Sequence, residues 1–202
     1  SQLSEGAFDI SFASVGQYYD YRSGEAPSDE VVAASREYIN YRAIKLDIAQ
    51  QTIAFASEGL QLDLGGIAKG FAVDRGIEII ARAGLLAGFV SAGGDSRILG
   101  DRGDRPRMVG IKHPRRDGEF AVMLPLADTA ISTSGDYERF FIRDGVRVHH
   151  ILDPKTGRSS GAAQSVSILA PFAIDSDALS TTTFILGVER GLALINSLPG
   201  VD

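Results

Sequence analysis

The sequence contains no cysteine. Disulfide bonds, thiolate catalysis and cysteine-based zinc sites are therefore excluded, and the chain gives no sign of its redox compartment. No apolar run approaches the ~20 residues of a membrane-spanning helix, and the opening residues 1–5 resemble no signal peptide. The formal net charge of -6 argues against nucleic acid as the main partner, because nucleic-acid binding needs a basic surface.

What is present is typical of a soluble globular protein: 202 residues, 44% of them hydrophobic and 23% charged. That length suffices for one sizeable domain or for two small lobes that share a core. Helix caps, alternating apolar residues and turn signals predict helices mixed with mostly antiparallel strands, and hence an α+β fold rather than a doubly wound parallel sheet. The expected helices cover 29–41 (after an N-cap at Ser28), 68–83, 176–186 and 188–198. The expected strands cover 43–48, 52–56, 60–64, 87–91, 107–111, 121–125, 140–143, 146–152 and 165–170.

Local signals refine some of these elements. Asp144-Gly145 is a strong two-residue hairpin signal. The helix over 68–83 is expected to bury Ala72, Ile79 and Ile80 and to end before Gly84. The closing helices are expected to separate at Gly187.

A glycine pair marks the first candidate site. A strand that runs into Gly65-Gly66 and then a helix exposes backbone N–H groups at a position that favours an anion. Lys69 would add a positive charge in the first helical turn, and Asp63 could hold a polar ligand group. The stretch matches neither the dinucleotide-binding fingerprint nor the P-loop. By itself it is more typical of a glycine helix cap with a surface lysine.

Asp177 and Thr181 form the second candidate site. Their i, i+4 spacing places them on one face of a helix, where both could bind the same small ion. A carboxylate and a hydroxyl are hard oxygen ligands that suit Mg²⁺ better than zinc or copper. In the alternative interpretation, Ser176 or Asp177 caps the helix and Thr181 simply faces inward. Spacing alone favours that alternative.

The pair His149-His150 is the third candidate site. Adjacent residues of a strand point to opposite faces, so the two rings cannot line the same site. One of them could be a base, or the histidine could simply be satisfied by hydrogen bonds at a strand edge, and the sequence favours neither. With only His113 elsewhere, a zinc site is not indicated. Two further stretches, 131–139 and 93–95, are turns that either face a ligand or simply connect strands.

The succession of these motifs closely resembles the ApbE family of FAD:protein FMN transferases, from about Gly6 to Gly187. The motifs are Gly6-Ala7-Phe8-Asp9, Asp63 to Gly70 followed by Phe71-Ala72-Val73-Asp74, Ala92-Gly93-Gly94-Asp95, Ser132-Thr133-Ser134-Gly135-Asp136-Tyr137, His149-His150-Ile151 with Asp153-Pro154 and Thr156-Gly157, and Asp177 to Thr181. The resemblance implies an ApbE-like, T-fold-related structure of largely antiparallel sheets with packed helices, whose active site lies in a cleft between lobes.

The resemblance also implies a reaction and the residues that perform it. Family members bind FAD and Mg²⁺ and transfer FMN to a threonine or serine of a partner protein, releasing AMP. The positions that match flavin contacts are Ala7, Phe8, Asp9, Asp63, Lys69 and Ile151. The Gly66 carbonyl and the side chains of Asp177 and Thr181 match the metal ligands, and His150 matches the base.

Partners and boundaries follow from the same resemblance. The acceptor would be a redox-complex subunit or an FMN-binding domain, and the protein would be periplasmic or anchored on the periplasmic side of a membrane. We expect one domain over 1–202 that lacks the family's N-terminal strand and helix and its final strand after Pro199-Gly200. The run 10–16 departs from the Thr-Val-Gly-Pro-like sequence of many members.

Other functions remain to be weighed against the transferase. The same residues with water as the attacking group would make an FAD pyrophosphatase, and without catalysis the chain would be an FAD-binding or carrier module. Asp177, Thr181 and His150 favour an enzyme, because a carrier needs neither a metal pair nor a base. A serine hydrolase is disfavoured, because the sequence has no G-x-S-x-G elbow.

Overall fold

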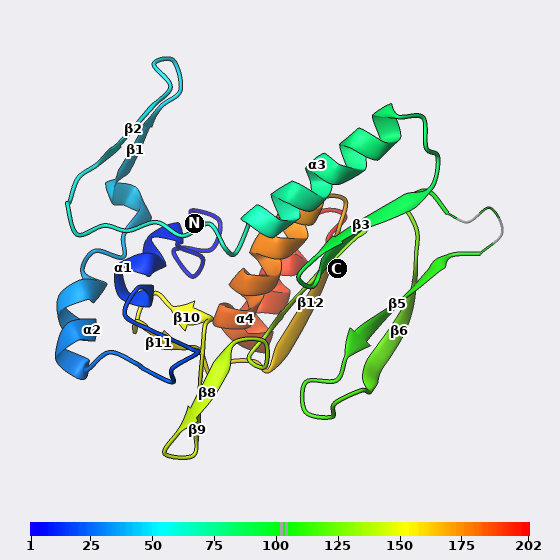
Figure 1. Cartoon of the computed structure of the whole chain (residues 1–202). Helices are drawn as coiled ribbons and strands as arrows, with labels where there is room; N and C mark the ends of the chain where they lie inside the picture. The colour runs from blue at the N-terminus through cyan, green and yellow to red at the C-terminus, as the bar shows by residue number, and fades with distance from the viewer. Residues whose placement is uncertain (102, 104) are drawn as a thin grey trace. The chain divides into compact units, whose positions relative to one another are not determined.

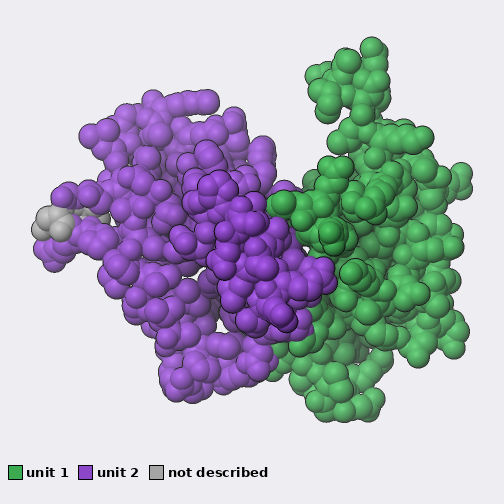
Figure 2. Space-filling model, turned by 180° about the vertical axis from the view of Figure 1, so that it is seen from behind, with its two compact units in different colours: residues 1–64, 136–161 green, residues 65–135, 162–202 purple. Residues whose placement is uncertain are grey.

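The computed structural model describes residues 1–101, 103 and 105–202. These residues group into two units, each assembled from two separate stretches of chain (Figure 2). Unit 1 contains Ser1–Leu64 and Asp136–Gly161, and unit 2 contains Gly65–Gly135 and Ala162–Asp202. The expectation of a single domain over 1–202 stays a prediction. Helices and antiparallel sheets occur together, which confirms the predicted α+β class.

Unit 1 combines short helices with two-stranded antiparallel ribbons (Figure 1). The Asp144-Gly145 hairpin is confirmed, and both residues have positive φ, as this tight turn requires. The helices of unit 1 are η1 (Ile10–Phe12), α1 (Ala13–Gly16), α2 (Asp29–Arg36) and η2 (Tyr41–Ala43). The paired strands are β1 (Ile44–Asp47) with β2 (Thr52–Phe55), β8 (Phe140–Arg143) with β9 (Val146–His149), and β10 (Leu152–Asp153) with β11 (Arg158–Ser159).

A glycine fixes the turn that joins β10 to β11. Gly157 has a φ of 68°, which favours glycine, and it lies against the buried side chains of Val15 and Val32. A Cβ at this position would lie 2.9 Å from a Val32 methyl group. The Thr156-Gly157 motif therefore serves the packing of unit 1, because only a residue without a side chain fits against this core.

Unit 2 is built on a four-stranded antiparallel sheet in the order β12-β7-β4-β3. Helices α3 and α4 pack against each other and against the sheet, α3 over β3 and β4 and α4 over β7 and β12 (Figure 1). The ribbon β5-β6 packs on the opposite face. The bounds are α3 (Ala68–Arg82), β3 (Gly88–Ala92), β4 (Asp95–Leu99), β5 (Arg107–Lys112), β6 (Phe120–Leu126), β7 (Ala130–Gly135), β12 (Ser165–Ala170) and α4 (Ala173–Ile195).

Alternate side chains of each strand point to opposite faces of this sheet. Ile98 and Ile131 point to the β5-β6 ribbon and form an apolar cluster with Leu126. Their neighbours Asp95 and Ser132 lie on the face that the helices cover. The helix-covered face of unit 2 therefore contains buried polar groups that need partners on α3 and α4.

Three predictions in unit 1 were wrong. The strand predicted over 146–152 is divided, since β9 ends at His149 and β10 begins at Leu152, and Ile151 N between them donates to His149 Nδ1 rather than to a neighbouring strand. The helix after Ser28 ends at Arg36 rather than at Tyr41, because Asn40 is extended and its side chain accepts from Arg42 N to start the separate turn η2. The segment 60–64 is not a strand. Its backbone donors bind outside any strand ladder, Gln61 N to Ser14 Oγ at 3.0 Å and Asp63 N to Ile10 O at 2.9 Å.

Helix α3 confirms the predicted helix but not the face expected to be buried. Ile79 is 65% exposed, Ala72 is exposed as well and Ile80 is half-buried, whereas Gly70, Val73, Asp74 and Ile77 are buried. Gly70 explains the difference, because a Cβ there would overlap with the Ala173 carbonyl oxygen. The close approach of α4 at this glycine, rather than the apolar count of each face, sets which side of α3 is covered.

Helix α4 is interrupted where the sequence predicted a separation, since Gly187 has non-helical angles of φ 78° and ψ 179°. The helix begins at Ala173, earlier than the predicted start. Among the described residues, α4 is the helix long and apolar enough, by length and composition, to cross a membrane. Its fully buried Phe184 and its packing on β7 and β12 are instead those of a core helix.

Close packing at Gly70 generates a stability prediction. We expect Gly70→Ala to lower the free energy of unfolding by about 1–3 kcal/mol, because the added methyl group forces α3 and α4 apart. Urea unfolding followed by circular dichroism measures the change. Gly161→Ala is the matched control, since a Cβ there meets nothing within 4 Å, and its effect should stay within about 0.5 kcal/mol. Equal effects of the two substitutions would contradict the packing argument.

Candidate functional site around Lys69

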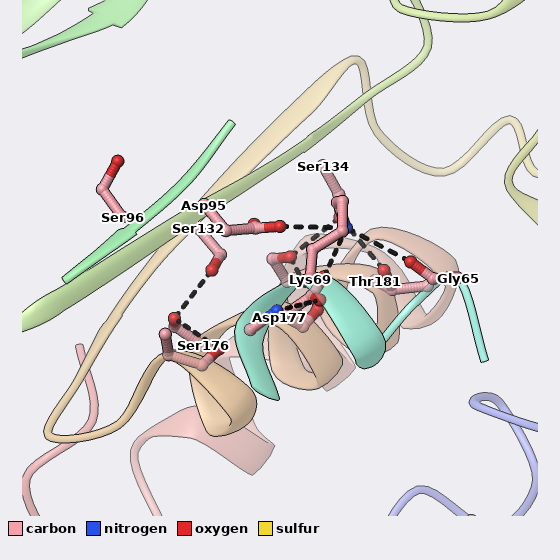
Figure 3. Close-up of polar contacts among 12 residues, drawn as sticks. Gly65, Lys69, Asp95, Ser96, Ser132, Ser134, Ser176, Asp177 and Thr181 are labelled. Atoms are coloured by element: carbon pink, nitrogen blue, oxygen red, sulfur yellow. Dashed lines mark hydrogen bonds and ion pairs between the residues drawn. The ribbon is translucent and has the colours of Figure 1, made fainter. Parts of the chain in front are cut away.

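The ammonium group of Lys69 lies among three oxygen atoms in unit 2 (Figure 3). Its Nζ is 2.9 Å from Asp95 Oδ2 and 3.0 Å from Asp177 Oδ1, and it donates to the Gly65 carbonyl at 3.2 Å. The side chains of both aspartates are only 3% exposed, whereas that of Lys69 is 40% exposed. Gly65, Lys69, Asp95 and Asp177 are called the Lys69 cluster below.

Three elements bring these side chains together. Helix α3 begins at Ala68, which places Lys69 in its first turn. Strand β4 begins with Asp95, directly after Gly93 and Gly94, whose φ angles of 55° and 99° make the tight turn from β3. A Cβ at Gly93 would lie 3.4 Å from Lys69 Cδ, so the lysine stem packs over this turn. The Gly-Gly-Asp motif therefore both turns the chain and delivers a carboxylate to Lys69.

Asp177 also closes the N-terminus of α3. Its Oδ2 accepts from Gly70 N at 2.9 Å, one of the first-turn amides that have no partner inside the helix. The N-cap residue Ile67 provides no side-chain cap, so Asp177 takes that role from another helix. A carboxylate is favoured at a helix N-terminus by the helix dipole. With Oδ2 held in this way, Oδ1 is directed at Lys69.

The alternative in which Ser176 or Asp177 caps α4 is wrong. The N-cap of α4 is Phe172, so both residues lie inside the helix. Ser176 Oγ shares a 2.7 Å hydrogen bond with Ser132 Oγ of β7. Thr181, one turn beyond Asp177, shares a 3.1 Å hydrogen bond with Ser134 Oγ. The Asp177/Thr181 pair thus lies on a helical face, as its spacing predicted.

Burial and charge act in opposite directions on Lys69. Burial alone would lower the pKa of Lys69, but its pairs with Asp95 and Asp177 outweigh burial and raise that pKa above its ordinary value. Burial, with the nearby charge of Asp177, raises the pKa of Asp95. Two carboxylates against one ammonium leave the Lys69 cluster with an excess of negative charge. The cluster therefore favours cations.

The oxygen atoms of this region also fit a hard metal ion. Asp177 offers a carboxylate and Thr181 a hydroxyl, and a backbone carbonyl of the glycine pair lies beside them. No group of three or more His, Cys, Asp or Glu side chains that could hold a metal occurs in the part of the chain that the structure describes. Mg²⁺ does not need one, because it is commonly held by one or two carboxylates together with substrate phosphates. The carbonyl in contact with Lys69 is that of Gly65, and the role of its predicted neighbour Gly66 stays a prediction.

Sequence reasoning included Asp74 in a motif but gave it no role, although it is as central to unit 2 as Asp177. Its Oδ1 accepts from Ala173 N at 2.9 Å and from Arg97 Nη1 at 2.7 Å, and its Oδ2 accepts from Ile174 N at 2.9 Å. Asp74 of α3 therefore caps α4, just as Asp177 of α4 caps α3. A carboxylate on the apolar stripe of a predicted helix was the available signal, since such residues are rarely buried without partners.

The two histidines of unit 1 do not share a strand, because β9 ends at His149 and His150 follows it. They nevertheless differ in exposure. His149 is buried, and its Nε2 is 2.8 Å from the Ser160 carbonyl oxygen. His150 is half-buried, and its ring meets the ring of Tyr21 edge-on at a centroid distance of 6.4 Å. Ile151 is buried beside them and donates its N–H to His149 Nδ1. His149 is thus engaged in the packing of unit 1, and His150 is the more accessible of the pair.

The remaining predicted flavin residues also lie in unit 1. Ala7 is buried, Phe8 is half-buried and Asp63 is exposed. The Asp9 carboxylate is already occupied by the chain, accepting from Ser11 N at 2.9 Å and Ser11 Oγ at 2.6 Å through Oδ1 and from Tyr41 N at 3.0 Å through Oδ2. Asp9 therefore fixes the local backbone of this motif. Its predicted contact with FAD stays a prediction, as do those of Ala7, Phe8 and Asp63.

The sequence was compared with protein-family models and with curated proteins. The sequence model of the ApbE family matches residues 1–202. The chain is 42% identical over 165 residues to FAD:protein FMN transferase from Treponema pallidum (strain Nichols), covering 76% of this chain and 46% of that protein. It is 35% identical over 190 residues to FAD:protein FMN transferase from Rhodobacter capsulatus, covering 92% of this chain and 36% of the relative. The chain thus spans less than half the length of these two curated relatives.

Solved structures agree with the fold. The ApbE protein from Thermotoga maritima superposes with a TM-score of 0.89 at 37% identity, covering 99% of this chain and 67% of that chain. Flavin transferase ApbE from Vibrio cholerae superposes with a TM-score of 0.85 at 30% identity, covering 97% and 64% respectively. The arrangement of antiparallel sheets and packed helices is therefore one that known structures share.

The cap formed by Asp74 generates a second stability prediction. We expect Asp74→Ala to cost about 2–4 kcal/mol, because it leaves two first-turn amides of α4 and the Arg97 guanidinium without their acceptor. Glu78→Ala, which removes an exposed ion-pair partner from the same helix, should cost within about 0.5 kcal/mol. Thermal and urea unfolding compare the two variants. A loss at Asp74 no larger than that at Glu78 would refute the capping role.

Proposed function

This chain belongs to the ApbE family, and from that membership we propose that it transfers the FMN part of FAD to a threonine or serine hydroxyl of an acceptor protein, releasing AMP. Relatives that carry the name FAD:protein FMN transferase match 76% and 92% of the chain. The observation that carries the proposal is the Lys69 cluster, where an ammonium group and two buried carboxylates meet at the start of α3. Neither a glycine cap nor a surface lysine would need that arrangement.

We assign to unit 2 the handling of the pyrophosphate. Cleaving FAD between its phosphates develops negative charge, which fixed donors and cations stabilise best in a water-poor site. Lys69 supplies such a cation in the first turn of α3. Asp177, Thr181 and the Gly66 carbonyl are the residues that would hold Mg²⁺. When bound, Mg²⁺ acts as a Lewis acid that withdraws charge from the phosphate oxygens.

We assign the proton transfer to His150. An acceptor hydroxyl is a weak nucleophile until a base removes its proton, and a positioned base typically contributes about 10²–10⁴-fold in rate. Histidine suits this step near neutral pH. His149 is engaged with Ser160, whereas His150 is half-buried at the edge of the Tyr21 ring. The hydroxyl oxygen then bonds to the FMN-side phosphorus, the bond from that phosphorus to the bridging oxygen breaks, and AMP leaves.

The flavin would be recognised by residues of unit 1. Ala7, Phe8, Asp63 and Ile151 are the proposed contacts there, in addition to Lys69 of unit 2. Asp9 is a further proposed contact, and its carboxylate also accepts from Ser11 and Tyr41 and so fixes the backbone of the motif. A cleft between lobes stays a prediction.

The biological setting remains part of the proposal. A redox-complex subunit or an FMN-binding domain would be the acceptor, and a periplasmic or periplasm-facing membrane-anchored location would fit the family. The negative net charge of -6 agrees with a protein acceptor and a small anionic substrate held by local donors, rather than with nucleic acid.

Incubation with FAD and Mg²⁺, with and without an FMN-binding acceptor domain, tests this function. We expect AMP release that depends on the acceptor and in-gel flavin fluorescence of the acceptor band. AMP and free FMN without any labelled acceptor would instead establish the FAD pyrophosphatase. Binding of FAD without AMP release under either condition would leave a carrier.

Thr181 allows a sharp test of the metal assignment. Thr181→Val removes one hydroxyl from α4 with almost no change in shape, and we expect it to lower the rate of Mg²⁺-dependent AMP release at least about tenfold. Thr183→Val is the matched control on the same helix. The Thr183 hydroxyl is buried and finds no hydrogen-bond partner among the residues that the structure describes, so its loss should leave activity and stability near the parent values.

The two threonine variants must be compared at equal folding, which circular dichroism and thermal unfolding establish. Raising the Mg²⁺ concentration should restore part of the Thr181→Val activity, because the lost hydroxyl is a ligand. Unchanged AMP release by a folded Thr181→Val variant would remove Thr181 from the metal site.

A further inference from the structure

The Lys69 ammonium occupies the point where the oxygen atoms of a cation site converge. Its Nζ contacts two buried carboxylates and a backbone carbonyl at 2.9–3.2 Å (Figure 3). One of these carboxylates, Asp177, is the residue proposed above to bind Mg²⁺ through an oxygen. The lysine and a metal would therefore need the same atom, Asp177 Oδ1.

Asp177 is held in place independently of the cation that it binds. Its Oδ2 accepts from Gly70 N at 2.9 Å, and this bond belongs to the packing of α3 against α4. Exchange of one cation for another at Oδ1 would therefore leave the carboxylate where it is. The site is prepared for a cation whether or not a metal is present.

Lys69 is the movable partner of this pair. Its side chain is 40% exposed although its ammonium contacts buried carboxylates, and its stem runs over Gly93, where no side chain obstructs it. A lysine side chain has several rotatable bonds and can withdraw towards solvent without a backbone change. Displacement therefore costs the ion pairs with Asp95 and Asp177 but requires no change in the fold.

We propose that Lys69 is an internal counter-ion that neutralises Asp177 in the metal-free protein and that a divalent metal displaces from it. The inference rests on the proposed function, since it concerns the same metal site. In this proposal the Lys69 side chain has two positions, one without metal and one with metal bound. In the metal-free protein the ammonium compensates buried carboxylates, and after metal binding it is released to meet the phosphates of FAD. Metal binding would then favour FAD binding, because the metal releases the lysine that contacts the FAD phosphates.

Metal affinity without FAD is the first test, with Mn²⁺ as the probe and electron paramagnetic resonance or calorimetry as the measurement. A competitor that fills the site most of the time lowers the apparent affinity by the fraction of time the site is free, so Lys69→Met should bind Mn²⁺ about tenfold or more tightly than the parent. Arg75→Met, which removes an exposed cation from the same helix, is the matched control and should leave the affinity unchanged. Equal or weaker Mn²⁺ binding by Lys69→Met would overturn the proposal.

Thermal unfolding supplies a second readout of the same variants. Without metal, Lys69→Met should melt at a lower temperature than the parent, because Asp95 and Asp177 lose their counter-ion. Saturating Mn²⁺ should then raise its melting temperature by more than it raises that of the parent. A smaller metal-induced rise than in the parent would count against displacement.

Lysine labelling of the parent protein avoids any effect of substitution on folding. Lys69 should react faster with an amine-acetylating reagent when Mg²⁺ or Mn²⁺ is added, because its ammonium is released from the carboxylates. Mass spectrometry resolves it from Lys45, Lys112 and Lys155, which serve as internal controls and should react at unchanged rates. Metal-independent or slower labelling of Lys69 would refute the displacement.

The outcomes separate this inference from the proposed function. AMP release from FAD by the parent together with unchanged labelling of Lys69 would retain the transferase or hydrolase and reject the displacement. Metal-dependent labelling without AMP release under any condition would retain the displacement and reject the enzymatic function.

Discussion

Reciprocal capping between α3 and α4 is the interaction on which the rest of unit 2 depends. Asp177 of α4 accepts from Gly70 N of α3, and Asp74 of α3 accepts from Ala173 N and Ile174 N of α4. Each helix thus satisfies first-turn amides of the other, which neither N-cap residue does with its own side chain. The exchange requires the helices to approach closely, and Gly70 is the position that allows it.

In this arrangement the Asp177 carboxylate has both a structural and a functional role. Asp177 Oδ2 belongs to the fold and Oδ1 to the cation site, so the fold itself orients the group that would bind a metal. Functional side chains that are fixed by structural bonds need no reorganisation when a ligand arrives. For the same reason a substitution at Asp177 changes stability and chemistry together, whereas the Thr181 hydroxyl caps no helix and shares its hydrogen bond with Ser134, so its loss separates the two effects.

The sequence predicted those features that local chemistry determines. The helix after Gly66, the interruption at Gly187 and the turn at Asp144-Gly145 are confirmed, because caps, glycines and turn residues act on their immediate neighbours. Strands β4 and β7 were missed, and Ser132 and Ser134 looked like turn residues because their partners on α4 lie more than forty residues further along the chain. The pairing of Lys69 with Asp177 spans 108 residues and leaves no local pattern at all. Only the order of motifs, through its family resemblance, suggested that the two belong together.

The hydroxyl groups between β7 and α4 show why a polar interface serves this site better than an apolar one. Ser132 pairs with Ser176 at 2.7 Å and Ser134 with Ser180 at 2.8 Å, so each buried hydroxyl finds a partner and little of the cost of desolvation remains. Larger apolar residues would push the helix away from the strand. Small paired hydroxyls instead hold α4 close to β7 over about one turn, and Asp177 and Thr181 lie on that same stretch of helix. The serine pairs therefore set the distance of Asp177 and Thr181 from the sheet, and Asp177 there pairs with Lys69.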